Sequence, residues 1–182
     1  HVSPHQVARS FGHEEAFQLL MGRSPDEIKL FTACWLGEEA GVKALLASHP
    51  DLAARLQGPE RRHLAHAARN NNLPAVRLML EAGLPLDAVS QHGATPLHWA
   101  AWHGNVEMVR LLLGRRPPLD VTDADFHATP LGWAIHASEH GWNPGGGDYP
   151  AVVTLLLQAG ATPPDQPAGT EAVREVLRAH GA

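Results

Sequence analysis

Residues 95–113 read TPLHWAAWHGNVEMVRLLL, and this stretch decides the fold. Thr95 can cap a helix with its hydroxyl, and Pro96 follows at the first helical position, where a missing N–H costs nothing. Gly104 can end that helix with a positive φ. From Val106 onward the apolar residues recur at helical spacing. The stretch therefore predicts two short helices joined by a tight turn.

The same pattern recurs along the chain at a nearly constant interval. A second copy begins at Thr129, 34 residues after Thr95. Towards the N-terminus, Leu64 aligns with Leu97 at an offset of 33 residues, and Leu30 aligns with Leu64 at an offset of 34. A period of this length indicates a solenoid, in which each repeat buries its apolar face against its neighbours.

The segment 95–100 resembles the ankyrin signature T-P-L-H-x-A at every fixed position. The resemblance implies an all-α ankyrin-repeat solenoid of about five helix-turn-helix repeats with short β-hairpin loops and a C-terminal capping helix. The style of the repeats is similar to that of bacterial ankyrin proteins. We expect one domain over residues 1–182, with a degenerate repeat at 1–24, repeats at about 25–57, 58–90, 91–123 and 124–162, and a capping helix at 168–180.

Composition and charge narrow the classes of partner. Hydrophobic residues make up 44% of the 182 residues, and the formal net charge is −5. This is a globular composition without the basic stripe of a nucleic-acid-binding protein, and no apolar run approaches the ~20 residues that span a bilayer. A single cysteine, Cys34, excludes an internal disulfide framework, so we expect a cytoplasmic protein. The chain begins with His1 rather than Met, so we expect a fragment or a processed form.

The chain is rich in residues that can carry chemistry, with 13 histidines and five tryptophans. His136 and His140 are four residues apart, which places them on one helix face and raises the possibility of a metal site. No cysteine or carboxylate stands at a matching ligand spacing, and the ankyrin resemblance gives His98 a structural role. Cys34 aligns with a packing position, Ala101, which favours a buried thiol over a nucleophile. We therefore expect no metal, no cofactor and no catalytic site.

Two groups of positions are candidates for binding a protein partner. The resemblance implies that the residues after the small pair of each repeat face a concave groove, and hairpin tips flank that groove. Large rings and guanidinium groups at such positions suit recognition of a protein. The candidates are Trp35, Arg69, Gln91, His92, Trp102, His103, His136 and Trp142. Trp99 and Trp133 replace leucine at a packing position, so we expect them in the core. Removing Trp102 or Trp35 should leave the fold nearly unchanged.

Residues 138–148 are an insertion that departs from the ankyrin pattern after Ala137. Insertions of this kind map to loops on one face of a solenoid, often the binding face. Trp142 can anchor a partner there, or it can fold back onto Trp133 or Trp102 and pin the loop; both interpretations remain open. The glycines at 145–147 favour a flexible stretch, and Asp148 is expected to cap the next helix.

The sequence therefore predicts a protein–protein interaction module that binds through its concave groove and hairpin tips. An alternative is a regulatory or substrate-recruiting domain of a larger enzyme whose catalytic part is absent here. A third class, a small-molecule or metal-binding pocket built from the Trp/His cluster, also stays open.

Overall fold

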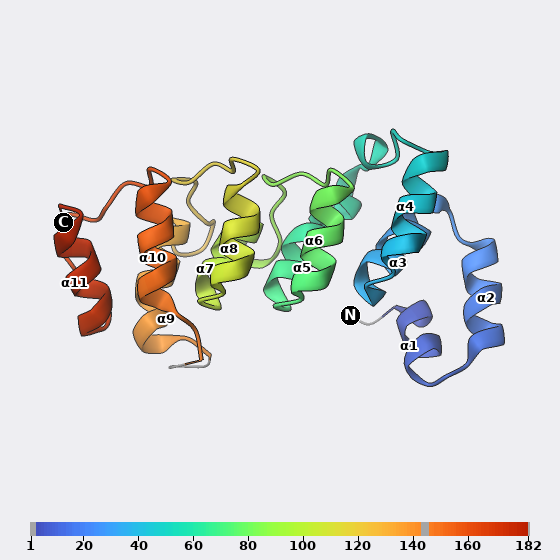
Figure 1. The fold of residues 1–182 in the computed structure, drawn as a ribbon, viewed down its shortest axis with the longest axis horizontal. Helices are drawn as coiled ribbons and strands as arrows, with labels where there is room; N and C mark the ends of the chain where they lie inside the picture. Colours follow the sequence, from blue (N-terminus) through green and yellow to red (C-terminus); the bar gives the residue numbers. More distant parts are fainter. Residues whose placement is uncertain (1–2, 143–145, 182) are drawn as a thin grey trace.

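The computed structural model describes residues 3–142 and 146–181, and within them antiparallel helix pairs stack in a single row (Figure 1). In the first four pairs a tight turn joins the first helix to the second, and in the fifth pair the insertion separates them. The α-helices are α1 (Pro4–Ser10), α2 (Glu14–Arg23), α3 (Asp26–Leu36), α4 (Glu39–Ser48), α5 (His63–Arg69), α6 (Leu73–Glu81), α7 (Pro96–Trp102), α8 (Val106–Leu113), α9 (Pro130–His140), α10 (Tyr149–Gln158) and α11 (Glu171–Ala179). Short 3-10 turns are η1 (Ala53–Arg55), η2 (Gly58–Arg62) and η3 (Gln91–Gly93).

Side-chain caps mark where several of the helices begin. The hydroxyl of Thr95 accepts a hydrogen bond from the backbone N–H of His98, and the His98 ring accepts one from the Thr95 N–H, which together form a capping box. The second helices α6, α8 and α10 begin after Asn72, Asn105 and Asp148, whose side chains each accept a backbone N–H. The predicted cap at Asp148 is therefore confirmed, and three repeats use the same device at the same position.

The turn inside each of the first four pairs contains a left-handed residue. Gly37 and Gly104 have φ values of 73° and 60° immediately after α3 and near the end of α7. Asn71 occupies the equivalent place after α5 with a φ of 52°. Asparagine is among the few residues other than glycine that tolerate this conformation. The repeat register read from the sequence therefore holds even where the glycine is replaced.

Small residues let the first helices approach each other closely. Ala67, Ala68, Ala100, Ala101 and Ala134 are all fully buried between α5, α7 and α9. These first helices pack against one another more closely than α6, α8 and α10 do. We call the side of the stack formed by these first helices the inner face. At the C-terminal end, α11 packs on α10 through the buried Val173 and Leu177.

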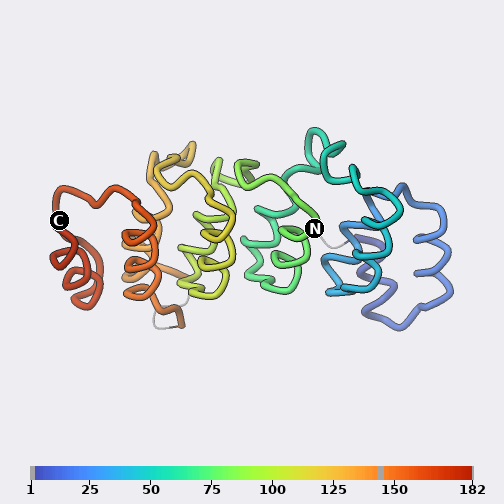
Figure 2. Tube along the Cα trace, turned by 45° about the horizontal axis from the view of Figure 1, so that its top comes forward, coloured from blue at the N-terminus to red at the C-terminus, as the bar shows by residue number. Residues whose placement is uncertain are grey.

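The loops between repeats line one edge of the stack (Figure 2). No strand occurs in the described residues, so the predicted hairpins close by turns rather than by a β-ladder. The backbone N–H of Ala124 donates to His92 O over 2.7 Å, which links two consecutive loops. The ring of His98 donates from Nε2 to Ala128 O over 3.0 Å. This bond confirms the structural role expected for His98.

Trp99 and Trp133 belong to the core, as predicted. Their exposed fractions are 1% and 6%, and their ring centroids lie 5.0 Å apart in an edge-to-face arrangement. Buried indole nitrogens need acceptors. Trp99 Nε1 donates to Ser90 Oγ over 2.8 Å, and Trp133 Nε1 donates to Asp123 Oδ2 over 2.9 Å. Each ring is thus buried on a first helix and tied to the loop that precedes it.

We predict that Trp99→Ala lowers the free energy of unfolding by about 3–5 kcal/mol, because it leaves a large cavity between stacked helices and an unpaired Ser90 hydroxyl. Trp142→Ala serves as the control, since that ring is 63% exposed and its loss should cost less than about 1 kcal/mol. Urea denaturation followed by circular dichroism measures both variants. Equal midpoints for the two variants would contradict the core role of Trp99.

Candidate binding site

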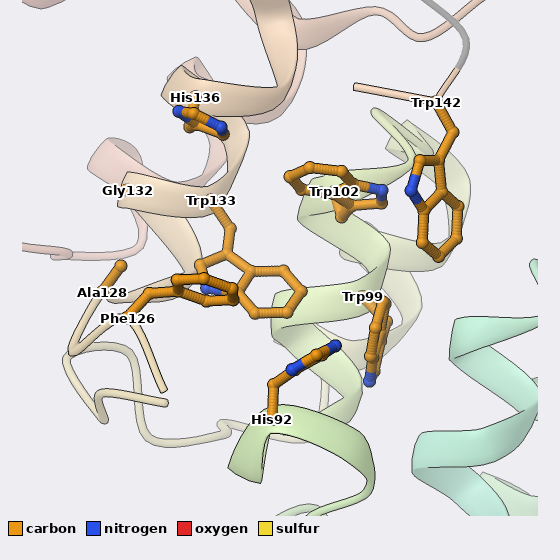
Figure 3. Close-up of a pocket in the computed structure, with 9 residues that line it drawn as sticks. All are labelled: His92, Trp99, Trp102, Phe126, Ala128, Gly132, Trp133, His136 and Trp142. Atoms are coloured by element: carbon orange, nitrogen blue, oxygen red, sulfur yellow. The ribbon is translucent and has the colours of Figure 1, made fainter. Parts of the chain in front are cut away.

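A pocket of about 360 Å³ opens between α7 and α9 on the inner face. We call it the aromatic pocket (Figure 3). Helix α7 contributes two rings, α9 contributes two rings and a glycine, and loop residues complete the wall. The lining residues are His92, Trp99, Trp102, Phe126, Ala128, Gly132, Trp133, His136 and Trp142.

The repeat register brings the rings of the two helices together. Trp99 and Trp102 are three residues apart on α7, and Trp133 and His136 have the same spacing on α9, so each pair shares one helix face. Trp133 packs beside Trp99, its counterpart in the preceding repeat. His136 lies beside Trp102 with ring centroids 6.1 Å apart and planes inclined by 25°. The helices position these four rings before any ligand arrives.

Asp123 fixes the loop below the pocket. Its carboxylate is 1% exposed and accepts hydrogen bonds from the backbone N–H groups of Asp125, Phe126 and Ala128 and from Trp133 Nε1. Burial raises the pKa of Asp123, but the hydrogen bonds from Phe126, Trp133, Ala128 and Asp125 outweigh it and hold the pKa below its ordinary value. The group is therefore an ionised carboxylate directly behind Trp133.

Trp102 and Trp142 form the outer part of the pocket. Trp102 is half-buried, and its ring meets those of Trp133 and Trp142 edge to face, each at a centroid distance of 5.6 Å. Its Nε1 is buried and has no hydrogen-bond partner among the described residues. Trp142 remains 63% exposed although it leans on Trp102. The fold-back and anchor interpretations of Trp142 are thus compatible, because one face of the ring packs and the rest stays open.

The structure distributes the eight predicted residues unequally. Four of them line the aromatic pocket: His92, Trp102, His136 and Trp142. Two adjoin it, since the guanidinium of Arg69 lies 5.5 Å from the Trp99 ring and His103 stands 5.6 Å from the Trp142 ring. Gln91 is exposed at η3. Trp35 lies apart, two repeats away on α3.

Trp35 and Trp102 are more deeply packed than the sequence suggested. Trp35 is half-buried and donates from Nε1 to Nδ1 of His63, 3.3 Å away in the next repeat. His63 in turn stacks on Phe31 with ring centroids 3.8 Å apart. Trp102 packs on the core from α7. The expectation that removing either ring leaves stability unchanged is therefore revised, because a following repeat covers part of each ring.

Two features of the pocket were missed from the sequence. Phe126 lines the pocket and is 66% exposed. An aromatic residue within the polar loop ADFHA at 124–128 is the signal that would have found it. The second feature is that Trp99 and Trp133, expected only as core, also form the pocket wall.

The insertion is more ordered at its ends than predicted. Helix α9 continues to His140, and Ser138 is buried, where its hydroxyl donates to Ile135 O over 2.7 Å. At the other end, the Asp148 N–H donates to Gly104 O, and a Cβ on Gly104 would stand 2.7 Å from the Gly147 Cα. Gly145, which belongs to the predicted flexible stretch, lies outside the described residues. Both ends of the insertion are therefore held by the solenoid.

Two observations bear on metal and nucleophile chemistry. Within residues 3–142 and 146–181, no group of three or more His, Cys, Asp or Glu side chains is arranged to hold a metal ion. His136 and His140 do face each other, with ring centroids 4.8 Å apart. Cys34 is fully buried, and burial raises the pKa of its thiol to about 12. None of the described helices is both long and apolar enough to cross a bilayer.

Comparison with known families places the fold. The family model described as ankyrin repeats in three copies matches residues 30–125 and 64–166, which together cover more than half of the chain. The chain belongs to the ankyrin-repeat family. Ankyrin repeats are non-catalytic modules that bind other proteins, and the aromatic pocket lies between two of the matched repeats of this ankyrin protein.

Individual relatives match over part of their length. The E3 ubiquitin-protein ligase XB3 of Oryza sativa subsp. japonica is 40% identical over 92 residues, which is 50% of this chain and 20% of that protein. The palmitoyltransferase Hip14 of Drosophila melanogaster is 28% identical over 120 residues, 66% of this chain and 17% of that protein. The human ankyrin repeat and SOCS box protein 3 is 28% identical over 97 residues, 53% and 17% of the two chains. The ankyrin chain thus spans about a fifth of the length of these relatives.

We predict that Gly104→Ala destabilises the protein by about 3 kcal/mol, because the new methyl group combines left-handed strain with a clash against Gly147. Gly37→Ala is the matched control: its φ is 73°, but a Cβ there meets nothing within 4 Å, so only about 1 kcal/mol of strain is expected. Thermal and urea melts compare the variants. Equal losses would show that the contact between Gly104 and Gly147 contributes nothing.

We predict that His63 makes stability fall with acidity. Burial, and secondarily the charge of His66, lowers the pKa of His63 to about 4. The folded state keeps His63 neutral while the unfolded chain, with a pKa near 6.5, takes up the proton. The contribution of His63 to the free energy of unfolding is therefore fully present above pH 6.5. It is lost progressively towards pH 4, by at most about 3 kcal/mol. In His63→Gln this slope of unfolding free energy against pH should become shallower; an unchanged slope would refute the assignment.

Proposed function

We propose that this chain recognises a protein partner on its inner face, with the aromatic pocket at the centre of the contact and η3 and the 124–128 loop at its rim. The observation that carries this proposal is the cluster of open rings there, with Trp142 63% and Phe126 66% exposed. Exposed large aromatic groups gathered on one surface are typical of interaction sites, and tryptophan is enriched among residues that dominate binding energy.

The contact would extend beyond the pocket to the other predicted residues. Gln91 is exposed beside the pocket, His136 is exposed where it lines the pocket, and Arg69 and His103 connect the pocket to α5. Arg69 O accepts a hydrogen bond from His103 Nε2 over 2.8 Å, so this flank is rigid and offers a polar rim to an apolar centre. That arrangement is usual for protein interfaces.

We further propose that the chain serves as the recruiting part of a larger protein rather than as an enzyme itself. The relatives with enzyme names match this chain over about a fifth of their length, which leaves their other regions for chemistry. We also propose a cytoplasmic location and no cofactor. The single cysteine is free and buried, which suits a reducing compartment.

We predict that Trp142→Ala weakens capture of the protein partner at least tenfold while the urea midpoint stays nearly unchanged, because the ring is exposed and central to the proposed contact. Affinity capture from the source cells would identify the binder, and calorimetric titration of the purified pair would measure its affinity. Leu19→Ala is the control, since Leu19 is 56% exposed on α2, at the far end of the row. Equal affinities for the two variants would show that the interface lies away from the pocket.

A further inference from the structure

The walls of the aromatic pocket present almost pure aromatic surface. Four tryptophan rings, one phenylalanine ring and two imidazoles line it, and Ala128 and Gly132 fill the remainder. Among the described residues that form this wall, none carries a carboxylate, an amide or a hydroxyl. The indole N–H groups of Trp99 and Trp133 donate hydrogen bonds to Ser90 and Asp123, outside the cavity. A guest therefore meets ring surface and few hydrogen-bond partners.

Negative charge lies directly behind this aromatic wall. The ionised Asp123 accepts the N–H of Trp133, so its charge stands at the back of that ring. Asp125, two residues further along the same loop, accepts a hydrogen bond over 2.7 Å from Nδ1 of His92, which lines the pocket. Carboxylates in these places do nothing for an apolar guest, but they add to the negative faces of the rings in attracting a cation.

The structure already contains one cation on these rings. The guanidinium of Arg69 lies 5.5 Å from the centroid of Trp99, within the range in which an indole attracts positive charge. Arg69 is not part of the pocket wall, so it leaves the cavity itself without a resident cation. The ring surface inside is free to hold another positive group.

The scarcity of acceptors in the wall, where only the imidazoles of His92 and His136 can supply them, selects among cations. A primary ammonium has three N–H donors, and two imidazoles with one acceptor nitrogen each would leave at least one of these donors buried without a partner. A quaternary ammonium has no N–H to satisfy and carries its charge on apolar methyl groups. Aromatic cages bind such groups through the ring faces. The volume of about 360 Å³ is at the small end of ligand sites, which suits a compact head group.

We propose that the aromatic pocket binds a trimethylammonium group. Trp99 and Trp133 form its floor, Trp102 and Trp142 its outer wall, and Asp123 and Asp125 supply the charge behind it. Two sources carry this group: a free quaternary amine of the choline type, or a trimethylated lysine side chain on a protein. This inference rests on the pocket alone. Binding of a trimethylammonium group can fail while the proposed protein contact holds, and the protein contact can fail while the pocket still binds that group.

Titration of the whole chain with choline, followed by NMR of the indole N–H signals, tests the proposal. Four of the five tryptophans line the pocket, and Trp35 lies two repeats away as an internal control. We expect saturable shifts of the four signals with Trp35 unmoved. The neutral isostere 3,3-dimethylbutan-1-ol has the same shape without the charge, and it should bind at least tenfold more weakly. Equal binding of the two compounds, or no shift with choline, would overturn the proposal.

One substitution distinguishes attraction of the cation to the ring face from burial of apolar surface. Trp142→Leu keeps an apolar side chain at an exposed site where folding is not at risk. The substitution should weaken choline binding about fivefold and leave the weak binding of the isostere unchanged, because only the cation is attracted to the π face. Trp35→Leu is the matched control, and choline should bind it as it binds the wild type. Equal weakening of both compounds in Trp142→Leu would show plain apolar burial and contradict a cation site.

A final comparison distinguishes the two sources of the group. A short peptide with one trimethyllysine and its unmodified counterpart are titrated under the same conditions. Tighter binding of the trimethylated peptide than of choline would point to a modified protein, and tighter binding of choline would point to a free amine. Tighter binding of the unmodified lysine peptide than of either would refute the selection against N–H donors.

Discussion

Everything in this molecule depends on the close approach of consecutive first helices through small residues. Ala100 and Ala101 on α7 and Ala134 on α9 are fully buried, and no larger side chain would let these helices meet. Because the contact is made at the same repeat position each time, it also sets the register. Side chains that share a position in the sequence repeat become neighbours in space. Trp99 and Trp133 pack together for that reason.

This dependence explains how much could be predicted. The helix pairs, the caps, the role of His98 and the burial of Trp99 follow from the local pattern and from the ankyrin resemblance, because each is decided within one repeat. Partial burial of Trp35 is decided by the next repeat, through its hydrogen bond to His63, and no pattern within α3 contains that neighbour. The same limitation hid Phe126, which comes from a loop whose conformation depends on Asp123.

The insertion shows a further limit of the sequence pattern. No repeat template exists for residues 138–148, so the extra turn of α9 and the buried Ser138 could not be derived. The Ser138 hydroxyl accepts the backbone N–H of Thr170 over 3.1 Å, which connects the extended α9 to the start of α11. The close approach of Gly147 to Gly104 is likewise a contact between residues far apart in the sequence. Together these contacts place Trp142 over the pocket.

The aromatic pocket is rigid on one side and open on the other, and both properties bear on binding. Asp123 and Ser90 hold the rings of Trp133 and Trp99 through their indole nitrogens, so a guest does not have to order these side chains. Among the described residues no hydrogen bond holds the indole of Trp142, which is 63% exposed and can adjust to the guest. The walls belong to two different repeats, so any occupant contacts both α7 and α9. A ligand that binds only the stacked arrangement stabilises that arrangement by mass action. Occupancy of the pocket therefore strengthens the same helix contact that builds it.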